Sequence, residues 1–485
     1  MKKTLWLLTI ILTFGLVISA CANPEDGGDS SVDGDEASEE DGVVTLDLWN
    51  RYPELRAPFD RLIEGFEEEH PDIKINKQDL PLESHEAQFQ TALSDNSLPD
   101  LFTTAADLQE LVEVDAVKDL DEVFTDEVRG EFVEGTWWEN GTTLDGTAYV
   151  FPFVSPKSGA MVMYYNLDVL EQYGLSEDDI PQTWEEFIEV GNTIYEESGE
   201  SIYPLAWNNE AWSNDSLVNM MGTAISPNTP WRFDYTEGQP SISTEGKVES
   251  AEYLKQLQQE NIMDPTSTEV STIDAEANFA AGNNAFWFSG NWTGTQLYND
   301  HGFENWGVAE LPTKDGEPYY YPAARQADGL QVSNNTEHWE EVKVFLEYAL
   351  DNLHEELYVK SGTGVPAKKD VGGEPPYDQY NDIVALMEEL AIPVPKPAQD
   401  NLNTVEFERS YNDSLGFAGI GDPVVGYLAG AVDDIEAEIE ELDEQAQGTF
   451  ETTLEEYPDV SSDDYKFPNW EPFTPYTLDD YEELD

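Results

Sequence analysis

The stretch that decides the fold is Val43-Val44-Thr45-Leu46-Asp47-Leu48-Trp49. Its β-branched and apolar residues predict a strand that is covered on both faces. A helical pattern follows between Pro58 and Pro71, with apolar residues at i, i+3, i+4 and i+7, namely Phe59, Leu62, Ile63 and Phe66. A strand over 73–75, a helix over 87–93 and a strand over 98–102 come next. This βαβαβ order predicts an α/β fold.

The middle of the chain shows the same alternation of strands and helices. Thr183 and Glu186 have the spacing of a capping box, in which each side chain satisfies a backbone N–H of the other residue. Further strands are predicted over 149–153, 161–165, 285–288 and 306–309, and further helices around 339–349 and 435–442. No repeat of 20–50 residues is visible in the sequence, which argues against a solenoid or a propeller.

The N-terminus has the features of an export signal. A basic start, a short apolar run over 5–18 and the residues Ile18-Ser19-Ala20-Cys21 predict a signal peptide over 1–20. The last four residues resemble the lipobox of bacterial lipoproteins, which implies a mature chain that begins at Cys21 and is lipidated there. A plain signal peptide with an incidental cysteine is the alternative. Residues 21–42 are acidic and lack apolar periodicity, so we expect a lipid-anchored acidic tether.

The composition excludes several classes of function. The 485 residues include 102 acidic and 22 basic ones, a formal charge of −80, yet 39 % are hydrophobic, which is enough for folded cores. Nucleic acid and anionic lipid headgroups are poor partners for such a charge. A single Cys excludes an internal disulfide, and five scattered His argue against a zinc site. The excess of carboxylates suggests a salt-loving host, with an alkaline habitat as the second hypothesis, because salt screens repulsion.

A family resemblance covers nearly all of the mature chain. It is carried, in order, by Leu46-Asp47-Leu48-Trp49, Phe66 to Ile73, Leu98-Pro99-Asp100-Leu101-Phe102, Tyr164-Tyr165-Asn166, Pro181 to Phe187, Ser289-Gly290-Asn291-Trp292, Trp306 to Pro312, and Gly364-Val365-Pro366-Ala367. With a lipobox in front of them, these segments resemble an extracellular solute-binding protein of the maltose- and oligosaccharide-binding type. Such a protein is the receptor lipoprotein of an ABC sugar importer.

The resemblance implies an α/β fold of two lobes that close on a ligand like a hinged clamp, the type II architecture of periplasmic binding proteins. Lobe one is expected at 43–153 plus 312–366, lobe two at 154–311 plus 367–450, and an acidic and aromatic C-terminal extension at 451–485. The implied function is binding a sugar, expected to be an oligosaccharide, and delivering it to the permease subunits of the transporter. We expect a monomer on the extracellular face of the membrane, with no enzymatic activity, no cofactor and no metal.

The candidate ligand contacts are aromatic, amide and charged residues, because a pyranose has one apolar face and a rim of hydroxyls. The resemblance points to Asn291 and Trp292 after a lobe-two strand, and to the loop that holds Trp207, Asn208 and Trp212. Trp49 and Arg51 follow the first strand, at the edge where open α/β sheets bind ligands.

Arg325 and Asp328 lie where the family returns toward lobe one. For each tryptophan the alternative is core packing, and for Arg51 it is an ion pair. Thr103 stands where the maltose-binding pattern has an aromatic residue, so a ligand other than maltose is expected. The Trp-rich loops suggest a ligand with more than one sugar ring.

A secreted polysaccharide-acting hydrolase is the alternative function. It would need two carboxyl groups at a set separation, which the sequence of so acidic a protein does not reveal. His85-Glu86 lacks the second His of a zinc protease motif, and neither a GxSxG elbow nor a P-loop is present. Measuring whether a candidate sugar is bound unchanged or cleaved separates the two functions.

Overall fold

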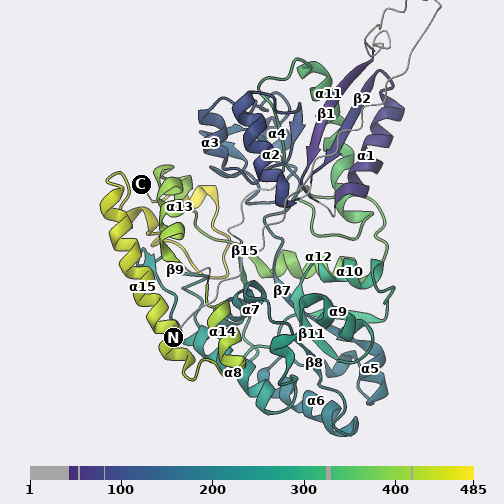
Figure 1. The fold of residues 1–485 in the computed structure, drawn as a ribbon, viewed down its shortest axis with the longest axis vertical. Coiled ribbons are helices and arrows are strands. Elements are labelled where there is room, and N and C mark those ends of the chain that lie inside the picture. The colour runs from purple at the N-terminus through teal and green to yellow at the C-terminus, as the bar shows by residue number, and fades with distance from the viewer. Residues whose placement is uncertain (1–42, 53–54, 81, 324–328, 417–418, 485) are drawn as a thin grey trace, which may run out of the picture. The chain divides into compact units, whose positions relative to one another are not determined.

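The computed structural model describes residues 43–52, 55–80, 82–323, 329–416 and 419–484. Within the compact unit Val43–Asp485 it contains two main β-sheets, each with helices packed on it and a hydrophobic core of its own (Figure 1). The elements around the first sheet are called the first lobe here, and those around the second sheet the second lobe. The expected two-lobed α/β fold is therefore confirmed.

The first sheet has the strand order β2-β1-β3-β14-β6, at Ile73–Asp79, Val44–Asn50, Leu101–Phe102, Gly329–Val332 and Val150–Pro152. β1 pairs in parallel with β2 and β3, and β14 pairs antiparallel with β3 and β6. Helices α1 (Arg56–Glu69) and α11 (Trp339–His354) pack beside β1 and β2 (Figure 1). The apolar stripe of α1 is buried as its spacing predicts, so the sequence pattern placed this helix correctly.

The prediction that β1 is covered on both faces is wrong. Leu46 and Leu48 are buried, but Thr45 and Asp47, which alternate with them, are exposed. Helices α1 and α11 cover the leucine face, whereas on the other face only the end at Trp49 is packed against a core cluster. On the other face Asp47 makes polar contacts at the surface, where its backbone N–H donates to Asp100 and its carboxylate accepts from Asn76. β1 is thus a half-buried strand with the alternation that such strands show.

Several predicted strands differ in length from the observed ones. The strand expected over 73–75 is β2, Ile73–Asp79, which extends further along β1. The strand expected over 98–102 is confined to β3, Leu101–Phe102, because Pro99 has no N–H for a ladder. The strand expected over 285–288 is β11, Phe286–Gly290, which continues to the residue before Asn291.

The second sheet has the strand order β12-β7-β11-β8, at Trp306–Ala309, Met161–Asn166, Phe286–Gly290 and Leu205–Ala206. Every residue of β7 is buried, since β11 and β12 flank it antiparallel. Helix α6 (Trp184–Glu197) has the predicted capping box: the Thr183 hydroxyl accepts from Glu186 N–H at 3.2 Å, and the Glu186 carboxylate accepts from Thr183 N–H at 3.1 Å. This prediction is confirmed.

Short strand pairs connect the rest of the chain. β13 (Tyr321–Ala323) pairs in parallel with β15 (Ala391–Pro393). β4 (Thr143–Leu144) pairs antiparallel with β5 (Thr147–Ala148). β9 (Phe233–Asp234) pairs antiparallel with β10 (Gln239–Pro240). The remaining α-helices are α2 Leu82–Asp95, α3 Leu108–Glu113, α4 Asp126–Arg129, α5 Leu167–Gln172, α7 Ala211–Thr223, α8 Glu245–Gln259, α9 Thr272–Ala280, α10 Thr293–Asn299, α12 Gln379–Leu390, α13 Asn403–Leu415, α14 Gly421–Leu428, α15 Ile435–Glu456 and α16 Leu478–Glu482. None of the helices in the described part of the chain has the length and apolar character needed to cross a membrane.

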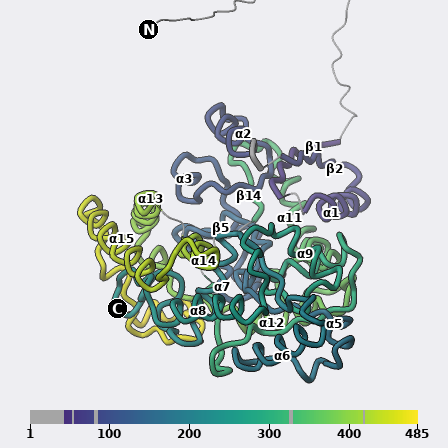
Figure 2. Tube along the Cα trace, turned by 60° about the horizontal axis from the view of Figure 1, so that its bottom comes forward, coloured from purple at the N-terminus to yellow at the C-terminus, as the bar shows by residue number. Residues whose placement is uncertain are grey.

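The C-terminal segment packs against the second lobe. Helix α15 lies beside α13 and α14 (Figure 2). Beyond it, Phe467, Trp470 and Tyr476 are buried in a small cluster with Tyr320 and Val394. The residue ranges expected for the two lobes and the extension stay predictions. Within them, Tyr319 and Tyr321 belong to the second-lobe core, and Leu330 and Val332 to the first.

Candidate ligand-binding site

A cleft of about 830 Å³ is lined by residues of both lobes. Tyr52, shortly after β1, and Phe153, after β6, line it from the first lobe. Asn291 and Trp292, which follow β11, line it from the second lobe together with residues of α10. The carboxyl ends of strands from two sheets therefore supply its walls, where α/β proteins usually bind ligands.

Trp292 is held in place by its neighbours in the chain. The buried Asn291 side chain accepts a hydrogen bond from Gly159 N–H at 3.0 Å, and its amide donates to the Ser158 hydroxyl at 3.3 Å. The indole folds back over Gly290, where a Cβ atom would lie 2.2 Å from the ring. Only glycine leaves room for this close approach. Trp292 is partly buried against the second-lobe core, so Asn291 and Gly290 together fix its ring at the cleft.

Trp212 extends this aromatic surface. The ring centroids of Trp212 and Trp292 are 5.7 Å apart, with 45° between the ring planes. Trp212 is the second residue of α7 and 49 % exposed. A tilted pair of indoles leaves apolar surface free beside the cleft, which suits the apolar face of a sugar ring.

Arg51 lies beside the cleft because it contacts Tyr52, which lines the cleft. Its guanidinium carbon is 5.1 Å from the centroid of the Tyr52 ring, and Tyr52 packs edge to face on Phe153. No carboxylate in the described part of the chain forms an ion pair with Arg51, so the ion-pair alternative has no support. Burial, followed by the charge of Arg51, lowers the pKa of His85, whose Nε2 is 3.0 Å from Thr103 O.

The other predicted contacts lie in different surroundings. Trp49 is partly buried against a core cluster that includes Phe89 and Phe102. Trp207 is only 6 % exposed in the second-lobe core. The side chain of Asn208 is buried and accepts from Glu210 N–H at 3.0 Å, which shapes the turn before α7. Arg325, Asp328 and Cys21 lie outside the described residues. The ligand contacts predicted for these residues, and the lipidation predicted for Cys21, stay predictions.

Residues 52–352 match the family of bacterial extracellular solute-binding proteins. The chain belongs to this family. Its members are binding proteins rather than enzymes, and the family name indicates an extracellular or periplasmic location. No group of three or more His, Cys, Asp or Glu in the described ranges has an arrangement that could hold a metal ion.

Curated relatives of this solute-binding protein are named for the sugars they bind. The chain is 24 % identical over 405 residues to the arabinooligosaccharide-binding protein of Halalkalibacterium halodurans, which covers 79 % of this chain and 83 % of that protein. It is 24 % identical over 357 residues to the multiple sugar-binding protein of Streptococcus mutans, with 71 % and 78 % covered.

Solved structures show the same fold. The sugar-binding protein MalE of Xanthomonas citri has a TM-score of 0.61 at 18 % identity, with 86 % of this chain and all of that chain covered. The solute-binding protein RafE in complex with raffinose has a TM-score of 0.59 at 16 % identity, with 84 % and 100 % covered. At these identities the likeness shows the fold alone.

The two cations that line the cleft of this solute-binding protein, Arg61 and Lys360, are paired with carboxylates. Arg61 Nε is 3.1 Å from the Glu356 carboxylate, and Lys360 Nζ is 3.0 Å from Glu355 and 2.5 Å from Glu356. The cleft therefore offers hydrogen-bonding groups and aromatic surface more than unbalanced positive charge, which suits an uncharged ligand.

Sequence reasoning missed several lining residues. Tyr52 directly follows Arg51 after the first strand and is not among the contacts predicted from the sequence. Thr295, Gln296 and Asn299 follow Trp292 at i+3, i+4 and i+7, so they lie on one face of α10 and line the same cleft. That helical spacing was the available signal. Arg61 and Lys360 gave none, because they reach the cleft from positions about 300 residues apart in the chain.

Proposed function

We propose that this chain is the receptor that binds an oligosaccharide and delivers it to the permease of an ABC importer. The observation that carries the proposal is the tilted Trp212 and Trp292 pair, which presents apolar ring surface beside a cleft lined by amide and hydroxyl side chains. A pyranose ring stacks on an indole by its C–H face and exchanges hydrogen bonds at its rim. Several relatives are named as sugar-binding proteins, which supports the same ligand class.

Ligand binding would engage both lobes at once. Trp292 and Gln296 approach the sugar from the second lobe, and Tyr52 and Arg51 from the first lobe. Because a sugar in the cleft contacts two bodies, it stabilises the arrangement in which they are closest. The permease then distinguishes loaded from empty receptor by this arrangement.

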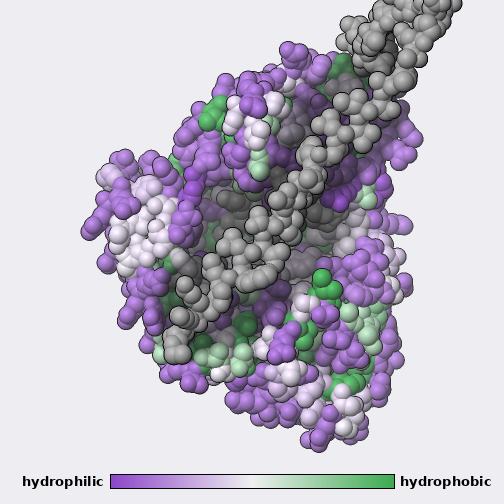
Figure 3. Space-filling model, in the orientation of Figure 1, coloured by the Kyte–Doolittle hydropathy of each residue, from purple (hydrophilic) through white to green (hydrophobic). Residues whose placement is uncertain are grey.

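We also infer how the receptor is placed in the cell. Cleavage before Cys21 and lipidation of its thiol would anchor the mature chain, and residues 22–42 would act as the acidic tether. The mature charge would be −82, since Lys2 and Lys3 are removed from a chain of −80. The visible face of the protein is mostly hydrophilic (Figure 3), in keeping with a monomer that functions in salt.

A thermal-shift screen tests the proposed function. Purified protein is heated with arabino-, malto-, xylo- and chito-oligosaccharides, and reducing ends are measured in the same samples. A bound ligand raises the melting temperature by mass action, and the recovered sugar is unchanged. New reducing ends would instead indicate the hydrolase. No shift with any sugar, together with a shift by a ligand of another class, would refute the sugar proposal.

A further inference from the structure

Three neighbouring strands of the first sheet end beside the cleft. β2, β1 and β3 run parallel, and Asn50 at the end of β1 lies opposite Asp79 at the end of β2. Thr103 directly follows β3, which pairs with β1 on its other side. The segment that leaves β1 between them carries Arg51 and Tyr52, the residues that approach the sugar from the first lobe in the proposed function.

The Asn50 side chain holds the backbone of Tyr52 by both of its polar groups. Asn50 Oδ1 accepts from Tyr52 N–H at 3.0 Å, and Asn50 Nδ2 donates to Tyr52 O at 2.9 Å. Asparagine side chains form such bonds to backbone two residues further on in turns. Nδ2 also donates to Asp79 Oδ1 at 2.8 Å, and Asp79 Oδ2 is 2.8 Å from Lys77 Nζ. The Lys77 side chain is only 7 % exposed, so the Asn50 amide has a fixed partner on β2.

Thr103 holds the backbone of Arg51, the residue between these two. Arg51 N–H donates to Thr103 Oγ1 at 2.9 Å, and the same hydroxyl donates to Trp49 O at 3.4 Å. Thr103 is 0 % exposed and Asn50 is 1 % exposed, and neither lines the cleft. The two buried side chains therefore determine where the backbone of Arg51 and Tyr52 lies, and they do so from behind the surface that meets the ligand.

Fixing this backbone also fixes the two side chains as a unit. The Arg51 guanidinium carbon is 5.1 Å from the centroid of the Tyr52 ring, and that ring packs edge to face on Phe153 with 5.7 Å between the centroids. Tyr52 and Phe153 both line the cleft. A displacement of the segment would therefore move the cation and the ring together, away from the place where they face the second lobe.

We propose that Asn50 and Thr103 are positioning residues for sugar binding, which hold Arg51 and Tyr52 in the binding conformation without touching the ligand. The proposal rests on the sugar site proposed above. A receptor whose binding conformation is only partly populated has its affinity reduced by that fraction. Removal of a bond that holds this conformation therefore weakens binding even though every contact residue is still present.

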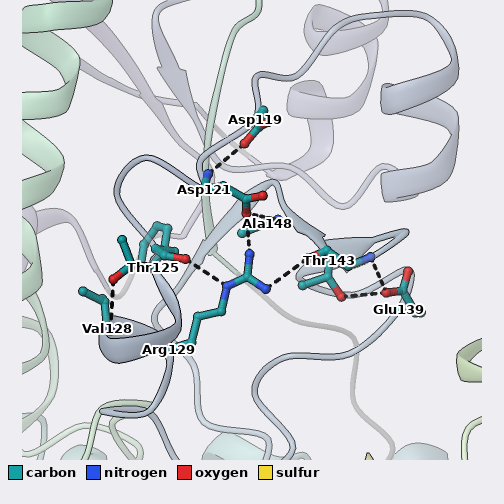
Figure 4. Close-up of polar contacts among 10 residues, drawn as sticks. Asp119, Asp121, Thr125, Val128, Arg129, Glu139, Thr143 and Ala148 are labelled. Atoms are coloured by element: carbon teal, nitrogen blue, oxygen red, sulfur yellow. Dashed lines mark hydrogen bonds and ion pairs between the residues drawn. The ribbon is translucent and has the colours of Figure 1, made fainter.

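A second polar network of the first lobe serves as the comparison. Figure 4 shows the Arg129 guanidinium at its centre, hydrogen-bonded to Asp121. Asp121 also accepts from Ala148 N–H at 2.9 Å, and Arg129 donates to Phe124 O at 2.9 Å and Gly146 O at 3.0 Å. None of these five residues lines the cleft. This network also joins side chains to the backbone of loops, but no proposed ligand contact depends on it.

The test compares two substitutions at Thr103. Thr103→Val keeps the shape of the side chain and removes its hydroxyl, whereas Thr103→Ser keeps the hydroxyl. Thr142→Val is the matched control in the same lobe, because the buried Thr142 hydroxyl accepts from Trp138 N–H at 3.2 Å and donates to Thr136 O at 2.7 Å. Isothermal titration measures the affinity for the sugar found in the thermal-shift screen, and the melting temperature of each ligand-free variant measures stability.

We expect Thr103→Val to bind the sugar roughly 3- to 10-fold more weakly than wild type, the change in population that the net contribution of one hydrogen bond produces. Thr103→Ser should restore the affinity to within about twofold of wild type, because it keeps the acceptor for Arg51 N–H. Thr142→Val should lose stability but bind within about twofold of wild type, because its hydroxyl holds no segment at the cleft.

Variants of the amide and of the contact residues extend the test. Asn50→Ala removes three hydrogen bonds and should weaken binding more than Thr103→Val. Its control, Asp121→Ala, should lower the melting temperature and leave the affinity within about twofold of wild type. In a protein that already carries Arg51→Ala and Tyr52→Ala, Thr103→Val should have almost no further effect on affinity, because the side chains that it would misplace are gone.

Amide hydrogen exchange at single-residue resolution tests the hydrogen bonds without any ligand. In ligand-free wild type the N–H groups of Arg51 and Tyr52 should be protected, and Thr103→Val should remove the protection of Arg51. The wild-type measurement does not depend on the folding of a variant.

Three results would overturn the proposal. They are an affinity of Thr103→Val equal to that of Thr142→Val, an affinity of Thr103→Ser as weak as that of Thr103→Val, and rapid exchange of both amides in ligand-free wild type. Failure of the proposed function gives a different result. Wild type then binds no sugar, and the role of Asn50 and Thr103 in sugar binding is refuted with it, whereas sugar binding that is unaffected by Thr103→Val refutes this role alone.

Discussion

Replacing Trp212 with alanine tests the aromatic surface at the cleft with little cost to the fold. Trp212 is 49 % exposed on the first turn of α7, and its ring centroid is 5.7 Å from that of Trp292. Trp292 itself is partly buried against the second-lobe core, so its removal disturbs packing as well as binding. Trp212→Ala therefore separates the two effects better than Trp292→Ala.

The expected loss follows from the free surface of the ring. A Trp side chain presents up to about 250 Å², of which about half, or ~120 Å², is available to a ligand here. At ~25 cal/mol per Å², full coverage by sugar would contribute ~3 kcal/mol, and coverage of one half ~1.5 kcal/mol. These free energies correspond to a roughly 10- to 150-fold weaker affinity of Trp212→Ala for the sugar.

Isothermal titration with the sugar identified by the thermal-shift screen measures this loss. Phe473→Ala is the matched control, because Phe473 is 38 % exposed and packs on Tyr320, away from the cleft. Trp212→Ala should keep the melting temperature of the ligand-free protein, whereas Trp292→Ala should lower both the affinity and that temperature. An affinity of Trp212→Ala within twofold of that of Phe473→Ala would refute the stacking role of this ring.

Three further outcomes are expected. Thr183→Ala, which removes a capping box, should lower the free energy of unfolding by ~0.5–2 kcal/mol in a denaturant titration, while Thr193→Ala on the exposed face of the same helix should change it by less than ~0.5 kcal/mol. Burial, with a smaller effect of Lys368, lowers the pKa of His354 to about 3, so the unfolded chain takes up this proton near pH 6.5 and the folded chain only near pH 3. Wild type should therefore lose about 2 kcal/mol more than His354→Leu between pH 7 and 5, and equal losses in the two proteins would contradict this. Finally, the melting temperature should rise from low to molar NaCl and rise less with an uncharged osmolyte, because salt screens the −80 charge; a flat NaCl series would argue against a salt-adapted surface.

The sequence predicted the elements whose local pattern and tertiary surroundings agree. The apolar stripe of α1 and the capping box formed by Thr183 and Glu186 depend on residues three or four apart. Each pattern is therefore complete within one short segment of the sequence. β1 shows the limit of this reasoning. Its run of β-branched and apolar residues is compatible with burial on both faces, but the helices of the first lobe leave Thr45 and Asp47 on one face exposed. Which face is covered depends on segments far away in the chain.

The candidate site shows the same limit more sharply. Trp207 and Trp212 are five residues apart in one polar loop region, yet one is buried and the other is half exposed. Trp207 directly follows β8, so its ring enters the second-lobe core, whereas Trp212 lies on the first turn of α7 and faces outward. Composition alone does not distinguish the two tryptophans. Helix α7 begins at Ala211, between them, and this start determines the direction in which each ring points.

The ligand class also depends on pairs that no local pattern reveals. Arg61 and Glu356 are 295 residues apart in the chain, and their ion pair removes from the cleft a positive charge that the sequence alone would assign to ligand binding. Lys360 is neutralised by the same carboxylate and by Glu355. An acidic sugar entering the cleft would meet these paired cations within a protein of net charge −80, and only Arg51, beside the cleft on Tyr52, could offset the hydration that its carboxylate loses. An uncharged oligosaccharide has no charge to desolvate. Its hydroxyls can form hydrogen bonds with the amide side chains of the cleft, and its ring faces can stack on Trp212 and Trp292.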